Sequence, residues 1–102
     1  MMTPRDVAAV RAIQASVAEA FCVPLALLMS RVRRPEIAVP RQIAMYLAYS
    51  ETTRSLPELG VLFERDHTTV LHALKAVGAR IKRDPSFAEL VGNVAAGLRR
   101  AA

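Results

Sequence analysis

The sequence has very few of the residues from which metal centres, disulfide frameworks and catalytic sites are usually built. Its 102 residues include one cysteine and two histidines, and tryptophan is absent. A single cysteine excludes an internal disulfide and any multi-cysteine metal site, which fits a reducing cytoplasm. No nucleophile is paired with a base and no cluster of metal ligands is visible, so we expect no metal, no cofactor and no enzyme activity.

Long apolar runs and glycine-rich loops are also missing. No stretch approaches the roughly 18 apolar residues that a membrane-spanning helix needs, and no signal peptide opens the chain. Of the four glycines, none is followed by lysine, so the G-x-x-x-x-G-K-[ST] loop that cradles nucleotide phosphates is absent. We therefore expect a cytoplasmic protein that binds no membrane and no nucleotide.

Positive charge is what the sequence has in excess, and the middle of the chain carries it. There are 14 basic and 9 acidic residues, for a net charge of +5. Residues 31–83 hold ten of the basic and five of the acidic side chains, whereas the two flanks cancel. Twelve of the basic residues are arginines, whose planar fork suits phosphates and guanine edges. The pattern favours a nucleic-acid face, with a solvated arginine-rich surface as the alternative.

The apolar residues recur at spacings of three and four, and alternating strand patterns are absent. With 53% hydrophobic and 23% charged residues, a packed core is expected. The sequence predicts an all-α fold, a compact bundle of about six helices that forms a single domain over residues 1–102. The expected helices span about residues 4–21, 25–29, 40–53, 56–63, 67–83 and 85–98.

Local signals mark several of the helix ends. Thr3-Pro4 and Asp66 are typical N-terminal caps, and Ser55-Leu56-Pro57-Glu58 has the form of a capping box. Asp84-Pro85 is expected to end the fifth helix and to begin the sixth. Residues 30–39, with Pro35 and Pro40, are expected to form an irregular basic stretch that ends where a helix begins at Pro40. In the last helix, Leu90 is expected to face inward together with its apolar neighbours.

A short helix, a tight turn at Glu64-Arg65 and a longer helix predict a helix-turn-helix over about residues 55–83. In that geometry the first residues of the second helix, here 66–69, meet base edges in the major groove. An aspartate there can accept a hydrogen bond from a cytosine amino group, and the free N–H groups of the helix can face a phosphate. The alternative is an ordinary polar helix start. His72, one turn further, is expected to be a partly buried packing residue.

Three runs, PRQIAMYL at 40–47, SLPELG at 55–60 and RDHTTVLHA at 65–73, closely resemble the C-terminal DNA-binding domain of the bacterial replication initiator DnaA. The resemblance covers about residues 7–83. It implies an all-helical domain whose helix-turn-helix binds double-stranded DNA at the DnaA box, a short asymmetric site of the TTATCCACA type. The implied role is chromosomal replication initiation or its regulation.

The resemblance also implies roles for individual residues. Arg33 matches an arginine that enters the minor groove and reads A·T pairs, and Pro57 matches a residue that touches a thymine methyl. The implied base-reading set is Arg33, Pro57, Asp66, His67 and Thr68. The implied phosphate-binding set is Arg31, Arg34, Arg41, Gln42, Leu56, Thr69 and Lys75, with Arg41 and Gln42 at a helix start. For Arg31 and Arg34 a solvated loop remains open, and for Arg54, Arg65 and Lys75 a solvated face is favoured.

Three departures from the family pattern bear on these roles. The family usually has Phe-Gly-Gly-Arg-Asp at the turn, whereas residues 63–66 read Phe-Glu-Arg-Asp, one residue shorter. The missing glycine is expected to change the turn and to rotate the second helix relative to the first. Tyr49 replaces a lysine or arginine and removes one phosphate contact. Glu51 occupies a usually apolar position and is expected to loosen the end of its helix.

The sequence leaves two hypotheses open. The first is a sequence-specific DNA-binding module, associated with the nucleoid, that acts at origins or at promoters with DnaA boxes. The second is a protein-interaction module of the same fold that regulates initiation or transcription without reading DNA, and for which the full-length initiator is a possible partner. The MMTPRD start favours a stand-alone DnaA-like protein over an excised domain.

Overall fold

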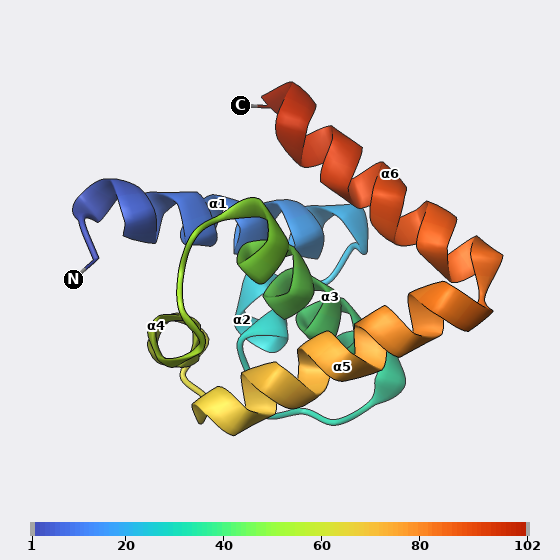
Figure 1. The fold of residues 1–102 in the computed structure, drawn as a ribbon, viewed down its shortest axis with the longest axis horizontal. Coiled ribbons are helices and arrows are strands. Elements are labelled where there is room, and N and C mark those ends of the chain that lie inside the picture. The colour runs from blue at the N-terminus through green and yellow to red at the C-terminus, as the bar shows by residue number, and fades with distance from the viewer. Residues whose placement is uncertain (1, 102) are drawn as a thin grey trace.

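The computed structural model describes residues 2–101, which form six helices joined by short turns (Figure 1). The helices are α1 (Pro4–Ala20), α2 (Leu25–Leu28), α3 (Pro35–Glu51), α4 (Leu56–Leu62), α5 (His67–Arg83) and α6 (Pro85–Ala101). Residues 2–101 contain no strand, so the prediction of an all-α fold of about six helices is confirmed. Within the same residues, none of the helices combines the length and the apolar character needed to cross a membrane.

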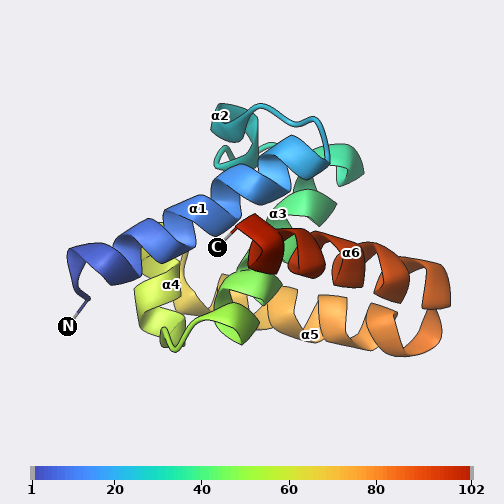
Figure 2. The same cartoon turned by 90° about the horizontal axis from the view of Figure 1, so that it is seen from above.

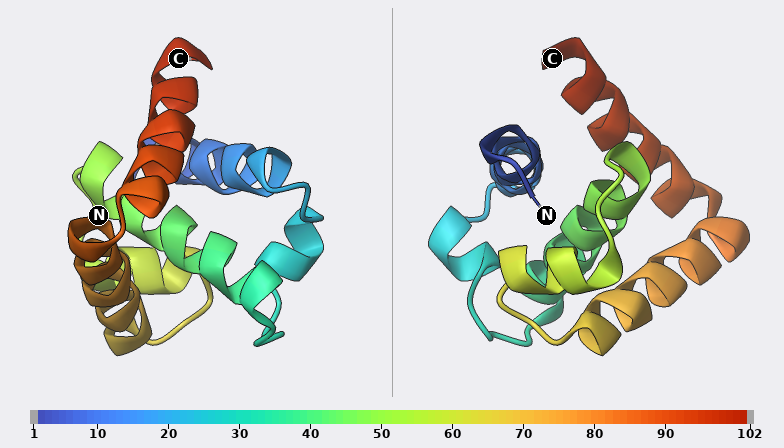
Figure 3. Two further views of the ribbon diagram at one scale, coloured as in Figure 1. Left: turned by 90° about the vertical axis from the view of Figure 1, so that its right-hand side faces the viewer. Right: turned by 60° about the vertical axis from the view of Figure 1, so that its left-hand side comes forward.

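Helix α3 is the central element of the fold. It lies between α1 and α5 in each view (Figures 1 and 3), and it packs against both of them as well as against α2 and α4. Figure 2 shows α6 folding back along α5, and its far end reaches α1. The innermost side chains include Ile43 and Leu47 of α3 together with Phe63 and Val70 from the α4–α5 region. Packing against α3 in the core therefore fixes the positions of α4 and α5.

The start of α3 differs from the prediction. The helix begins at Pro35, so the irregular basic segment ends at Arg34, and Pro40 lies inside the helix. Arg34 has the extended backbone that a following proline favours, and Pro35 suits a first helical position. The apolar period continues back to Ile37, which is buried, as is Pro40. This burial offsets the hydrogen bond that Pro40 removes from the helix.

The corner between α5 and α6 was predicted correctly, and the inward face of α6 only in part. Asp84 Oδ1 accepts a hydrogen bond from the Phe87 backbone N–H at 3.1 Å, and the Arg80 guanidinium lies 4.0 Å from the centre of the Phe87 ring. Phe87, Val91 and Ala95 form the buried stripe, at a spacing of four residues. Leu90 lies off that stripe and is 42% exposed, so its predicted inward orientation is wrong.

Candidate nucleic-acid interface

Helix α4 starts with the predicted capping box. Ser55 Oγ accepts a hydrogen bond from the Glu58 N–H at 3.3 Å, and Glu58 Oε1 accepts one from the Ser55 N–H at 2.9 Å. Two backbone donors that have no partner inside the helix are satisfied in this way. The box fixes the first turn of α4, where Leu56 is half-buried and Pro57 is exposed.

The turn after α4 closes without a glycine at its left-handed position. Glu64 has φ 55°, its N–H donates to the Val61 carbonyl at 3.1 Å, and the Arg65 N–H donates to the Gly60 carbonyl at 2.8 Å. These two bonds form a Schellman motif. Gly60 is nevertheless required, because a Cβ at that position would lie 2.8 Å from the Arg65 carbonyl oxygen. The turn therefore depends on a close backbone approach at Gly60.

The first turn of α5 presents a polar end to solvent. Asp66 Oδ1 accepts hydrogen bonds from the Thr68 backbone N–H at 2.8 Å and from the Thr68 hydroxyl at 2.7 Å. The Thr68 backbone N–H, then its hydroxyl, and then the nearby His67 lower the pKa of Asp66. Residues 66–69 are all exposed, whereas Val70 is fully buried and faces the core. Carboxylate, imidazole and hydroxyl groups thus lie together at the end of a helix.

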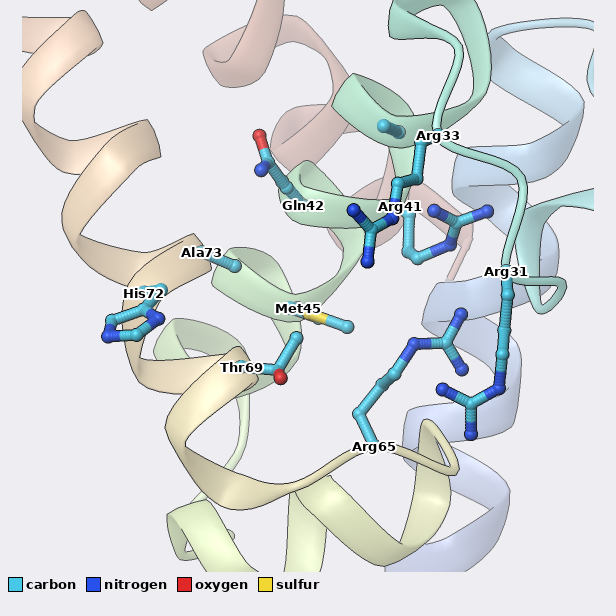
Figure 4. A pocket seen from close by; sticks show the side chains of 10 residues that line it. Arg31, Arg33, Arg41, Gln42, Met45, Arg65, Thr69, His72 and Ala73 are labelled. Carbon is cyan, nitrogen blue, oxygen red and sulfur yellow. The ribbon is translucent and has the colours of Figure 1, made fainter.

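A hollow of about 360 Å³ separates this helix end from the basic segment between α2 and α3. Figure 4 shows the guanidinium groups of Arg31, Arg33, Arg41 and Arg65 around it, with Thr69 and His72 of α5 on the opposite wall. Residues that are far apart in the sequence therefore form one positively charged wall. Such a wall attracts anionic groups.

Arg41 lies in this wall but is turned inward. Its guanidinium donates to the Leu28 carbonyl at 2.6 Å, to the Val32 carbonyl at 2.9 Å and to the Leu27 carbonyl at 3.1 Å, and the residue is only 8% exposed. Burial and then the charge of Arg65 lower the pKa of Arg41. The predicted position of Arg41 at a helix start is wrong, because α3 begins six residues earlier, at Pro35. Three of its five N–H groups hold the backbone that leads into the basic segment.

The structure brings some of the remaining predicted residues to the hollow and places others outside it. Gln42 and Thr69 line the hollow. Arg34 is exposed and pairs with Glu36 at 3.6 Å, outside the lining. Lys75 is exposed two turns along α5 from Thr68, on the same face of the helix.

Two of the polar or charged residues that line the hollow, His72 and Arg65, were not among the predicted site residues. His72 lines the hollow and is exposed, so its predicted partial burial is wrong. Its spacing of three residues from Thr69 places both on one face of α5, and this signal could have found it. Arg65, for which a solvated face was favoured, is half-buried and hydrogen-bonded. No periodic signal marks it, because its partners lie in another segment.

The two other unusual positions lie on α3. Tyr49 is 48% exposed and presents a neutral ring. Glu51 is the last residue of α3, and its carboxylate accepts hydrogen bonds from the Arg99 side chain at 3.1 and 3.2 Å. The residue that was expected to loosen the end of α3 instead ties it to α6.

Comparison with known proteins places this geometry in a family. The profile of the family described as bacterial DnaA protein helix-turn-helix matches residues 10–77. The chromosomal replication initiator protein DnaA of Caldanaerobacter subterraneus is 45% identical over 82 residues, which cover 80% of this chain and 18% of that protein. The protein of the same name from Methylibium petroleiphilum is 54% identical over 67 residues, which cover 65% of this chain and 14% of that protein.

A solved structure supports the same conclusion. The crystal structure of a DNA replication initiation factor superposes with a TM-score of 0.83 at 33% identity, over 91% of this chain and 29% of that one. Measured against the full-length initiator proteins named above, the chain spans less than a fifth of the length of these curated relatives. On the matched profile, the sequence identity and the shared fold, the chain belongs to the family of bacterial DnaA helix-turn-helix domains.

Proposed function

We propose that this chain binds double-stranded DNA and reads a DnaA-box-like sequence, in the initiation of chromosomal replication or in its regulation. The supporting observation is the hollow, because it joins four arginines from three segments to the polar end of α5. A duplex placed there would meet a recognition helix and a basic segment together. The family assignment supports the same proposal.

The first turn of α5 would read base edges in the major groove. The Oδ2 atom of Asp66 accepts no hydrogen bond from residues 2–101 and can accept one from a cytosine amino group. The Thr68 hydroxyl donates to Asp66, so its oxygen faces the bases as an acceptor. His67 is exposed beside them, and the exposed Pro57 ring can touch a thymine methyl.

Arg33 would act in the adjacent minor groove, where width and potential favour an arginine at A·T pairs. It is exposed in the segment before α3 and lines the hollow. Phosphate contacts would then fix the register of the domain on the duplex without carrying sequence information. The proposed phosphate-binding residues are Arg31, Arg34, Arg41, Gln42, Leu56, Thr69 and Lys75. Arg41 can contribute only the two N–H groups that its carbonyl partners leave.

Selection from random duplexes at physiological salt tests the proposal directly. We expect enrichment of a DnaA-box-like sequence. Arg33→Ala is expected to weaken binding to that sequence by about 1–3 kcal/mol while the melting temperature stays unchanged. Arg100→Ala, which removes the same charge from an exposed position in the last turn of α6, is the control and should bind normally. Binding without enrichment would contradict sequence reading, and no binding would favour the protein-partner alternative.

A second measurement separates the recognition of base edges from the binding of phosphates. Thr68→Ala should reduce the preference for the selected sequence over a scrambled one, because base-edge contacts carry the sequence information. Arg31→Ala should weaken both duplexes alike and lower the salt slope by about one. Affinities measured at several salt concentrations decide between them. The same profile for both variants would contradict this division of roles.

A further inference from the structure

Arg65 connects two segments that are distant in the sequence. One terminal nitrogen of its guanidinium donates to the Phe63 carbonyl at 3.2 Å and to the Glu64 carbonyl at 3.1 Å, both within the turn between α4 and α5. The other donates to the carbonyl of Ser30, which is 35 residues away, at the start of the basic segment. Burial, and then the charge of Arg31, lower the pKa of Arg65. One planar group therefore holds the turn and the basic segment together.

The basic segment is fixed from its other side as well. Arg41 holds the carbonyls of Leu27, Leu28 and Val32. The Ser30 hydroxyl donates to the Leu27 carbonyl at 2.6 Å and accepts from the Val32 N–H at 3.3 Å. These contacts attach the segment to α2 and α3. Among residues 2–101, only two hydrogen bonds join residues 30–34 to the turn after α4: the bond from Arg65 to the Ser30 carbonyl, and a longer one of 3.5 Å from Arg31 to the Glu64 carbonyl.

This arrangement matters because the two segments carry different reading groups. Arg33 lies in the basic segment, and Asp66, directly after Arg65, caps α5. Simultaneous contact with two grooves requires a fixed distance between these groups, since each misplaced contact lowers the gain from the other. A hydrogen-bonded link between the segments sets that distance before DNA arrives.

We propose that Arg65 is a positioning residue that fixes Arg33 relative to the first turn of α5, so that both enter one duplex together. The inference rests on the proposed DNA binding and adds a role that needs no contact between Arg65 and DNA. The alternative role is a direct charge contact with a phosphate. The two roles make opposite predictions for a lysine, which keeps the charge but lacks the planar fork that reaches both segments.

The first experiment compares Arg65→Lys with Arg65→Gln for binding to the selected duplex. Positioning predicts that both variants lose about tenfold in affinity and keep the salt slope of the wild type. Lys75→Gln, at an exposed position of α5 among the proposed phosphate-binding residues and outside the link between the two segments, is the control and should lower the slope by about one. Wild-type affinity in Arg65→Lys, or a reduced slope in Arg65→Gln, would overturn the proposal in favour of a charge contact.

A double-mutant cycle tests the link to Arg33 itself. If Arg65 positions Arg33, then Arg33→Ala should cost several-fold less affinity in the Arg65→Gln background than in the wild type. Losses that simply multiply would show that the two arginines act independently, which contradicts the proposal. Thermal melts of each variant by circular dichroism confirm that the helices are intact, and Arg65→Lys serves if Arg65→Gln does not fold.

A third measurement uses the protein without DNA. Amide hydrogen exchange of residues 30–34 should become faster in Arg65→Lys and Arg65→Gln, while exchange in α3 and α5 stays unchanged. An unchanged basic segment would overturn the proposal whatever the affinities are. If the segment loosens as expected but the wild type binds no duplex, the proposed function fails while the structural link stands. The two failures are therefore distinguishable.

Discussion

Helices α1 and α4 have the same local structure at both ends, but different parts of the chain pack against the turns that follow them. Each begins with a capping box, formed by Thr3 and Asp6 in α1 and by Ser55 and Glu58 in α4. Each ends with a phenylalanine cap and a Schellman turn whose left-handed residue is not glycine: Cys22 has φ 54° and Glu64 has φ 55°. Sequence-local rules thus build the same ends twice.

The difference between the two turns lies in what approaches them. Three residues before the phenylalanine cap, α1 has Ala18 and α4 has Gly60. Only glycine fits in α4, because a Cβ at position 60 would lie 2.8 Å from the Arg65 carbonyl oxygen. After the first turn, Val23 enters the core, and after the second, α5 begins at once. The comparison shows that a non-glycine residue can occupy the left-handed position of a Schellman turn. Glycine is required instead at position 60, where the backbone of the following turn comes close to the helix.

The largest expected effect comes from making the α4 turn resemble the α1 turn. Gly60→Ala should lower the free energy of unfolding by about 2–3 kcal/mol, because the added methyl forces the backbone of the turn apart. It should also weaken DNA binding, since α5 begins at the displaced backbone. Denaturant titration measures the first effect and duplex affinity the second.

Gly78→Ala is the matched control for that prediction. Gly78 lies inside α5, and a Cβ there would meet nothing within 4 Å. The exchange should therefore raise stability by about 0.5–1 kcal/mol through helix propensity. Equal stabilities for the two alanine variants would contradict the role assigned to Gly60.

The next effect concerns the way α1 supports α4. The Leu62 carbonyl at the end of α4 accepts hydrogen bonds from Gln14 Nε2 at 3.0 Å and from the Arg11 side chain at 2.6 Å, and Gln14 is buried. Gln14→Leu should cost about 1–2 kcal/mol, because a buried carbonyl loses one of its partners. Asn93→Leu, at an exposed position of α6, is the control and should leave the denaturation midpoint nearly unchanged. No loss in Gln14→Leu would mean that Arg11 alone satisfies the carbonyl.

A smaller gain is expected from glycine at the two left-handed positions. Cys22→Gly and Glu64→Gly should each stabilise the fold by about 0.5–1 kcal/mol, because glycine adopts a positive φ without the steric cost of a Cβ. The nearly equal φ values predict nearly equal gains. Thermal melts of both variants test this, and a gain at only one position would show that the two turns are not equivalent.

The smallest effect is the dependence of the two capping boxes on pH. The main cause that lowers the pKa of Asp6 is the hydrogen bond from the Thr3 backbone N–H, and for Glu58 it is the hydrogen bond from the Ser55 backbone N–H. The positive charge of Arg54 contributes to both, because its guanidinium lies 3.2 Å from the Asp6 carboxylate and 3.4 Å from the Glu58 carboxylate. A lowered pKa stabilises the fold above the ordinary value near pH 4, and this contribution is lost as the pH falls through the native pKa.

The measurement for the capping boxes is the melting temperature between pH 7 and pH 2.5. Glu58→Gln should melt lower than the wild type at pH 7 and approach it in acid, because the ionised carboxylate contributes only above its pKa. Parallel curves for the two proteins would contradict the assignment. Asp6→Asn provides the same test at α1 and should behave alike.

How far the sequence predicts the structure depends on whether the signal is local. The caps at Thr3, Ser55 and Asp66 and the corner at Asp84-Pro85 were predicted correctly, because each involves residues within three or four positions of one another. The predicted start of α3 at Pro40 is wrong, because a proline inside a helix is locally unfavourable and a local pattern therefore indicates a boundary there. The burial of Ile37 and Pro40, a tertiary effect, outweighs the local preference.

The candidate site divides in the same way. The exposure of Asp66, His67 and Thr68 follows from the polar start of α5 and could be predicted. The burial of Arg41 and the partners of Arg65 could not, because both arginines donate to carbonyls of other segments. Sequence patterns describe which side chains a segment offers, but not which backbone carbonyls elsewhere lack a partner.

The bond between Gln14 and Leu62 has a consequence for the order of events in folding. Its two residues are 48 positions apart, so it forms only after a large loop of chain has closed, whereas the capping boxes and the α5–α6 corner close early. We therefore expect Gln14→Leu to have a φ-value near zero: the variant should fold at the wild-type rate and unfold faster. Docking of α1 onto the end of α4 is then a contact that slows unfolding of the domain without changing its folding rate.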